Sequence, residues 1–293
     1  MRPHPRTRLC QWIADRYPTA RVERSAALRL VWRGLLAVIA PRGPVEIRTR
    51  DYRMRADPRR AQIGGSILRR CGYDRTTTDH FRAAVRPSML VIDVGSNVGH
   101  YALVAAAALR GTGEVRAYEP EPKAFAELEG NVRLNGFSNV VARHAAVSER
   151  HGRAGLFVDA GNAGGHSLAE ANTRRGDGRV EVQTVTLDEE CAGRPVGLLK
   201  IDAQGAEAKI LLGAREVLTR ARPLVYLEFW PHGVRGCGSD PLEVPDTIRS
   251  YGYRARVIER RRGRIRDAEP GELERIAASD DRRLGCNLLL EKA

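Results

Sequence analysis

The apolar positions of this chain follow one rhythm before residue 89 and another after it. From Ser25 to Ala40 apolar residues recur at helical spacing, which predicts an amphipathic helix. This helix either packs on the main domain or on a second subunit, or contacts a membrane surface through Trp32 and the flanking arginines. Residues 45–56 then alternate apolar and charged side chains, which indicates a half-exposed strand or hairpin. We therefore expect a helix and a hairpin in an N-terminal extension, residues 1–63, ahead of a domain at 64–293.

From Met89 onward, short apolar runs alternate with helical stretches. The runs predicted as strands are 89–94, 114–118, 140–145, 197–201, 224–229, 254–259 and 286–291, with a further polar–apolar segment at 180–186. The stretches predicted as helices are 101–109, 123–135, 206–218 and 245–251. Such alternation with short connections is typical of a parallel sheet covered on both faces. The Gly- and Asn-rich residues 159–178 are expected to form a long loop of the kind that lies over the site.

The excess of positive charge lies ahead of the predicted α/β part. Residues 1–88 carry 20 arginines and 7 acidic residues, a net of +13 that equals the formal charge of the whole chain. The predicted α/β part is therefore electrically balanced and gives no electrostatic reason to expect nucleic acid. The five cysteines are scattered and never in CxxC spacing, so we expect neither a zinc site nor a disulfide framework, and a reducing cytoplasm. No apolar stretch approaches the roughly 20 residues that a transmembrane helix needs.

A glycine-rich turn follows the first predicted strand of the α/β part, in the sequence VIDVGSNVG at 91–99. Ligands of open α/β sheets bind at the carboxyl ends of the strands, where this turn must lie. Gly95 and Gly99 let the backbone pass close to a ligand. Asn97 stands where a third glycine is common, and asparagine tolerates left-handed geometry. Asp93, at the strand tip, can accept hydrogen bonds from a cationic amino-acid group or a hydroxyl.

A second acidic residue narrows the choice of ligand. Glu119 ends the next predicted strand, 20 residues beyond Gly99, a spacing at which an acidic side chain takes both ribose hydroxyls. The turn reads DxGxNxG, and its leading Asp93 would repel the pyrophosphate that a GxGxxG turn binds. S-adenosylmethionine has no phosphate and carries a sulfonium and an ammonium group. The pattern therefore favours S-adenosylmethionine, with its adenine expected near Ala146, after the third strand.

Together these segments resemble the FkbM family of S-adenosylmethionine-dependent methyltransferases over residues 64–291. The resemblance is carried by DVGSNVGHYAL at 93–103, YEPEP at 118–122, LNGFSNV at 134–140, HAAVSERHG at 144–152, VTLDEE at 185–190, LLKIDAQGAE at 198–207, LEFW at 227–230 and NLLLEK at 287–292. It implies a Rossmann-like class I fold with a doubly wound, mostly parallel seven-stranded sheet. It also implies O-methylation of a hydroxyl on a sugar, natural product or other small molecule. Gln204 departs from the family's DxEGxE, which puts any catalytic or metal-linked role of that acid in question here.

Two carboxylates are the main candidates for the acceptor half of the site. Asp202 and Glu228 each close a predicted strand, and the usual strand order makes them neighbours. They could hold a divalent cation through oxygen ligands, or Asp202 alone could position or deprotonate the acceptor hydroxyl. A third interpretation leaves both structural, as helix caps or acceptors of backbone amides. His166, in GNAGGHSL, is the histidine candidate for a general base because its ordinary pKa lies near neutrality. His232 is a second histidine that could face the substrate.

Two other classes of function compete with a small-molecule methyltransferase. A nucleic-acid methyltransferase would use the basic N-terminal segment, but amino-purine enzymes carry an Asn/Asp-Pro-Pro-aromatic motif where this chain reads IDAQG at 201–205. The N-terminal segment also lacks the basic and aromatic interleaving that stacks on bases. The second rival is a module that binds the cofactor without catalysis, and Gln204 is the feature that favours it. The oligomeric state is left open.

Overall fold

The computed structural model describes residues 43–57, 74–159, 164–173, 176–259 and 262–293. The helix expected at 25–40 and the domain boundary expected after residue 63 lie outside these ranges. The expected hairpin is present, with β1 (Val45–Arg48) antiparallel to β2 (Arg53–Ala56). It packs on the main domain, because its buried residues Ile47, Tyr52 and Met54 share a hydrophobic core with the central sheet.

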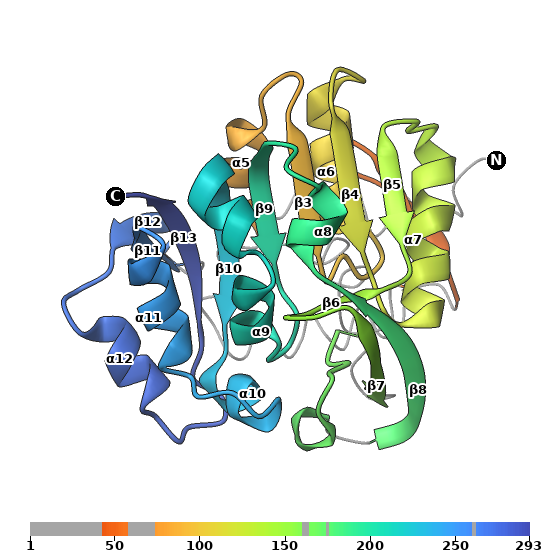
Figure 1. Ribbon diagram of the computed structural model, residues 1–293. Helices are drawn as coiled ribbons and strands as arrows, with labels where there is room; N and C mark the ends of the chain where they lie inside the picture. Colours follow the sequence, from red (N-terminus) through yellow and green to blue (C-terminus); the bar gives the residue numbers. More distant parts are fainter. Residues whose placement is uncertain (1–42, 58–73, 160–163, 174–175, 260–261) are drawn as a thin grey trace, which may run out of the picture.

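Eight strands form the central sheet, in the order β12-β11-β13-β10-β9-β3-β4-β5 (Figure 1). Their bounds are β3 (Leu90–Val94), β4 (Glu114–Tyr118), β5 (Val140–Arg143), β9 (Val196–Ile201), β10 (Leu224–Phe229), β11 (Tyr253–Glu259), β12 (Arg264–Asp267) and β13 (Cys286–Lys292). The five strands from β10 to β5 are parallel, whereas β13 runs antiparallel between β10 and β11. The predicted mostly parallel sheet is thus confirmed, but its strand number is not, because β12 turns back from β11 and adds an edge strand.

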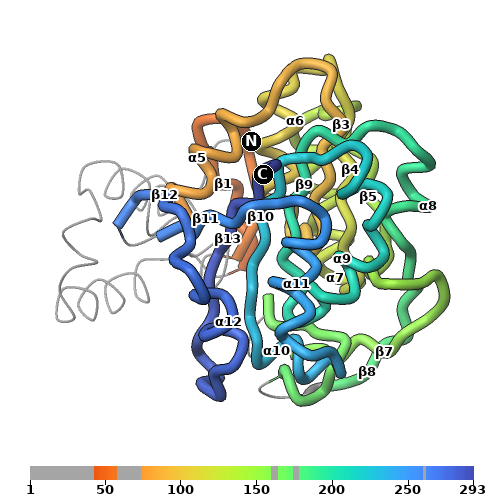
Figure 2. The backbone as a smooth tube through the Cα atoms, turned by 60° about the vertical axis from the view of Figure 1, so that its left-hand side comes forward, coloured from red at the N-terminus to blue at the C-terminus, as the bar shows by residue number. Residues whose placement is uncertain are grey.

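Helices cover both faces of this sheet. One face carries α5 (Arg75–Ala84), α6 (His100–Leu109), α7 (Pro122–Asn135) and the β1–β2 hairpin, and the other carries α8 (Leu187–Cys191), α9 (Glu207–Leu212), α11 (Glu243–Ser250) and α12 (Glu272–Ala277). Successive side chains of a strand point to opposite faces, so Val91 packs in the first layer and Ile92 in the second. On the first face α5 and the hairpin lie next to each other (Figure 2), joined by an ion pair of 2.6 Å between Arg82 and Asp51.

The helix expected over 206–218 is broken. It consists of α9 and a separate π-helical turn, η2 (Val217–Ala221). The break falls at Gly213, where a Cβ atom would lie 2.1 Å from the carbonyl oxygen of Ser148. Only glycine allows this approach of two backbones, so packing overrides the helical periodicity of the sequence.

A small second sheet lies below the carboxyl ends of the central strands (Figure 1). It has the order β6-β8-β7, with bounds β6 (Ala146–Val147), β7 (Gly152–Asp159) and β8 (Gly176–Val185). The strand predicted at 140–145 therefore ends early, and the chain continues into this other sheet. Within the described residues, no helix is both long and apolar enough to cross a membrane.

Candidate functional site

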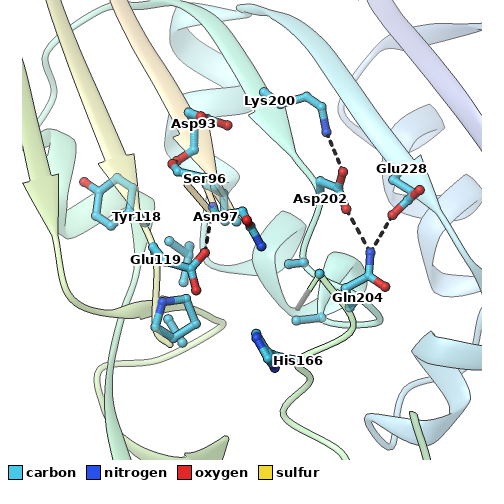
Figure 3. A pocket seen from close by; sticks show the side chains of 18 of the residues that line it. Asp93, Ser96, Asn97, Tyr118, Glu119, His166, Lys200, Asp202, Gln204 and Glu228 are labelled. Carbon is cyan, nitrogen blue, oxygen red and sulfur yellow. Dashed lines mark hydrogen bonds and ion pairs between the residues drawn. The ribbon is translucent and has the colours of Figure 1, made fainter. Parts of the chain in front are cut away.

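A cavity of about 360 Å³ opens at the carboxyl ends of β3, β4, β9 and β10 (Figure 3). The predicted site residues that line it are Asp93, Gly95, Asn97, Glu119, Ala146, His166, Asp202 and Glu228. Gly99 is the exception, because it does not belong to the lining of the cavity. Its φ is +99°, and a Cβ there would lie 2.7 Å from Leu128 on α7. Gly99 thus allows the turn to pack closely on α7, and its approach to a ligand stays a prediction.

The glycine-rich turn is held from both neighbouring strands. The backbone N–H groups of Gly95 and Ser96 both donate to the carbonyl oxygen of Tyr118, at 3.0 Å. Gly95 has φ +74°, and a Cβ there would lie 1.9 Å from the carbonyl oxygen of Asp202. Asn97 has φ +50°, the left-handed geometry expected for it. The turn therefore brings the tips of β3, β4 and β9 together around one cavity.

Asp93 lies at the floor of this cavity and is almost fully buried. Its Oδ2 has no hydrogen-bond partner among the described residues. Burial raises the pKa of Asp93 to about 6, although the ammonium of Lys200 acts in the opposite direction. Lys200 is the residue directly opposite on β9. Buried carboxylate oxygens normally accept a hydrogen bond, and a ligand or a water molecule in the cavity can supply the donor for Asp93 Oδ2.

Glu119 lies at the tip of β4, across the cavity from Asp202 (Figure 3). Its two oxygens accept backbone N–H groups, one from Asn97 and one from Glu121, both at 2.8 Å. Burial raises the pKa of Glu119 to about 7, against the lowering effect of these two bonds. Because each carboxylate oxygen has a second lone pair, a fixed Glu119 can still accept two hydroxyl donors.

On the other side of the cavity four polar side chains form a row, Lys200–Asp202–Gln204–Glu228 (Figure 3). Lys200 Nζ lies 3.3 Å from Asp202 Oδ2. Gln204 Nε2 donates to Asp202 Oδ1 at 3.0 Å and to Glu228 Oε2 at 2.8 Å. The expected pairing of Asp202 and Glu228 is thus present, but an amide nitrogen lies between them where a cation was one hypothesis. No group of three or more His, Cys, Asp or Glu side chains that could hold a metal occurs in the described residues.

His166 belongs to residues 164–173, of which Gly164, His166, Ser167 and Leu168 line the cavity. The loop expected at 159–178 is shorter in the structure, because β7 includes Asp159 and β8 begins at Gly176. Its Nδ1 accepts the backbone N–H of Asp159 at 3.1 Å. The neutral ring therefore carries its proton on Nε2, and burial lowers the pKa of His166 so that this neutral form prevails. A general base would need a lone pair where His166 has an N–H, so this arrangement offers the cavity a hydrogen-bond donor. His232 does not line the cavity.

Two features of the site do not follow from the predicted motifs. Lys200 was a detectable one, because it is the single charged residue in the buried strand VGLLKI. The other is a buried network on His100, in which Tyr52 Oη lies 2.6 Å from Nδ1 and Thr78 Oγ1 lies 2.9 Å from Nε2. Burial lowers the pKa of His100 to about 3, so its ring is neutral. No local pattern links these three residues, which come from the hairpin, α5 and α6.

Comparisons with known proteins allow this chain to be assigned to a family. Over 160 residues the chain is 28% identical to the 2-O-methyltransferase NoeI of Sinorhizobium fredii, which covers 49% of this chain and 64% of that protein. A solved FkbM methyltransferase from Methylobacillus flagellatus aligns with a TM-score of 0.44 and 15% identity, over 77% of this chain and 52% of that one. A Streptococcus mutans protein solved with SAH aligns with a TM-score of 0.43 and 8% identity, over 75% of this chain and 97% of that one.

The chain thus spans less than two thirds of NoeI and about half of the Methylobacillus protein. Because both structural alignments have low identity and TM-scores below 0.5, the assignment rests on the sequence of the domain itself. The methyltransferase FkbM domain matches residues 93–255, which begin at Asp93 and include every strand tip that lines the cavity. The chain belongs to the FkbM methyltransferase family.

Proposed function

We propose that this protein transfers a methyl group from S-adenosylmethionine to a hydroxyl oxygen of a glycan or other small-molecule acceptor. The observation that supports it is the division of one cavity into two halves. Asp93 lies on β3 and Glu119 directly follows β4, whereas Asp202 directly follows β9 and Glu228 lies on β10. The name of NoeI, a 2-O-methyltransferase, is consistent with an oxygen acceptor.

The donor half suits S-adenosylmethionine because it offers two buried carboxylates, while Lys200, a cation in the lining, is paired with Asp202. Asp93 Oδ2, which has no partner among the described residues, would accept the ammonium group, and Glu119 would accept the ribose hydroxyls. Ala146 leaves room for an adenine face, and the Nε2–H of His166 is a further donor toward the ligand. When bound, the cofactor supplies a methyl group on a positive sulfonium.

The acceptor half must orient a hydroxyl and remove its proton. In the transfer an O–C bond forms as the S–C bond breaks, and the hydroxyl proton leaves. Asp202 and Glu228 line the same cavity and are the carboxylates that would take this proton. Their fixed positions also align the nucleophile, and alignment can account for about 7 kcal/mol or more of the barrier in favourable cases.

The test is transfer of labelled methyl from S-adenosylmethionine to a panel of glycans and small hydroxyl compounds. Asp202→Asn and Glu228→Gln should lower kcat by about 10²–10⁴-fold, as expected when a proton acceptor is removed. Glu181→Gln is the matched control, because Glu181 pairs with Arg153 on the surface of the small sheet, away from the cavity. Methylation of a nucleic acid in place of every hydroxyl compound would contradict the proposal, as would full activity in both carboxylate variants.

A further inference from the structure

Gln204 ties together two carboxylates that belong to neighbouring strands. Its Nε2 donates to Asp202 Oδ1 at 3.0 Å and to Glu228 Oε2 at 2.8 Å. A side-chain amide nitrogen has two hydrogens, so each carboxylate takes one of them. Hydrogen bonds to ionised acceptors are shorter and stronger than neutral ones. The amide therefore fixes the distance between Asp202 and Glu228 and the direction of the oxygens that it binds.

The backbone around Gln204 is built to place this side chain. Gln204 has φ +51°, a left-handed conformation that a glutamine adopts only where its surroundings impose it. Its carbonyl oxygen accepts Ser167 Oγ at 2.8 Å and Asn172 Nδ2 at 3.2 Å. Both donors are buried and belong to residues 164–173. The segment that covers the cavity thus also holds the backbone of Gln204.

The residues on either side of Gln204 are held as firmly. Glu207 is fully buried, and its Oε1 accepts the backbone N–H of Ala203 at 3.2 Å and of Gly205 at 3.1 Å. Gly205 has φ +109°, and a Cβ there would lie 2.3 Å from the carbonyl oxygen of Gly233. The turn is therefore fixed by α9, by α10 (Pro231–Gly236) and by residues 164–173 at once. Strained residues over-determined in this way are typical of functional sites.

We propose that Gln204 is a positioning residue that holds Asp202 and Glu228 in place for the acceptor. Its side-chain amide occupies the position that a divalent cation would take between two carboxylates. This chain therefore works without such a cation. A cation between them would have to displace the amide from both oxygens. The proposal rests on the proposed function only in placing the acceptor at this pair. The link between the carboxylates itself is independent of the reaction.

Two substitutions test the hydrogen bonds of Gln204 to the two carboxylates separately from the stability of the fold. Gln204→Met keeps the length of the side chain and the same backbone strain but has no hydrogen-bond donor. Gln204→Glu completes a set of three carboxylates, which the described residues otherwise lack. Mn²⁺ is the probe, because it prefers oxygen ligands. Calorimetry without cofactor or acceptor should show saturable Mn²⁺ binding at this position in the Glu variant and none in the original protein or the Met variant.

Methyl transfer then tests the positioning role. In the Met variant kcat should fall about 10- to 100-fold, the loss expected from a misplacement on the order of 1 Å, while KM for S-adenosylmethionine stays unchanged. The Glu variant should lose activity on chelation and regain it with Mn²⁺. Thermal unfolding and cofactor binding show whether each variant is folded.

Three results would overturn the proposal. They are saturable Mn²⁺ binding by the original protein at this pair with loss of transfer on chelation, undiminished kcat in the folded Met variant, and no Mn²⁺ binding by the Glu variant. Because the calorimetry needs no turnover, failure of every hydroxyl acceptor would count against the proposed function and leave the test of Gln204 intact.

Discussion

The binding of a nucleoside at the tip of β4 should depend on pH through Glu119. Burial raises the pKa of this carboxyl from 4.5 to about 7. Ribose hydroxyls are donors and need the ionised carboxylate, whereas the protonated form has lost one acceptor site to its own proton. Nucleoside binding should therefore favour the ionised form of Glu119. At a pH where Glu119 of the free protein is protonated, binding should release that proton.

The size of the effect follows from linkage. Below the pKa of about 7 the apparent Kd should rise as the pH falls, so that binding near pH 6.5 is about fourfold weaker than near pH 8. The same shift acts on stability. Since the folded pKa lies above the unfolded one, the unfolded chain loses its proton first, and stability falls as pH rises from 4.5 to about 7. A fully realised shift corresponds to a loss of about 3 kcal/mol in the unliganded protein.

The ligand for this experiment is 5′-methylthioadenosine, which has the ribose hydroxyls but no titrating amine or carboxylate. Calorimetry in buffers of different ionisation enthalpy measures the proton release directly. Asp93, with a pKa of about 6, adds its own titration at lower pH, so the range above about pH 6.5 isolates Glu119. Glu119→Gln is the matched control and should bind weakly with no slope. A flat Kd and no proton release in the original protein would refute the assignment of Glu119 to the ribose.

Other predictions concern the packing around the cavity. Gly95→Ala places a Cβ 1.9 Å from the carbonyl oxygen of Asp202 and should lower the free energy of unfolding by about 2 kcal/mol or more, measured by denaturant titration; a stability within error of the original would contradict the close approach. Tyr52→Phe removes the hydroxyl 2.6 Å from His100 and should lower the melting temperature by an amount equivalent to about 1–2 kcal/mol. Lys200→Met removes the ammonium beside Asp202 and should lower the free energy of unfolding by about 2 kcal/mol, less than the loss for a fully buried pair, because Asp202 is partly exposed. Lys200→Arg keeps the positive charge and should therefore avoid most of this loss.

The central strands could be predicted because the local sequence pattern and the packing within the sheet favour the same conformation. The run EVRAY at 114–118 alternates polar and apolar side chains, and β4 has these same bounds. The predictions fail where contacts with residues distant in the sequence determine the local structure. Gly213 interrupts a good helical pattern because the backbone at Ser148 approaches it. The edge strand β12 is charged on the solvent side and exists through its pairing with β11, which local periodicity does not reveal.

Which residues gather in the site could be predicted for the same reason, because parallel strands bring their carboxyl ends to one edge. What each residue does there depends on partners that sequence spacing does not give. His166 was expected to be a base, and a single backbone N–H from Asp159 makes its ring a donor toward the cavity. Asp202 and Glu228 were expected to be neighbours, and the side chain that joins them is Gln204, which the sequence marked only as a departure.

The cavity also depends on residues that precede the family's domain. His100, which lines the cavity, is fixed by Tyr52 from the hairpin and by Thr78 from α5. Both lie ahead of residue 93, where the matched domain begins. Because these hydroxyls engage both ring nitrogens, His100 is held as a neutral wall of the cavity and is not available as a base. The hairpin therefore helps to shape the cavity, and under the proposed function substitutions in it should change nucleoside binding.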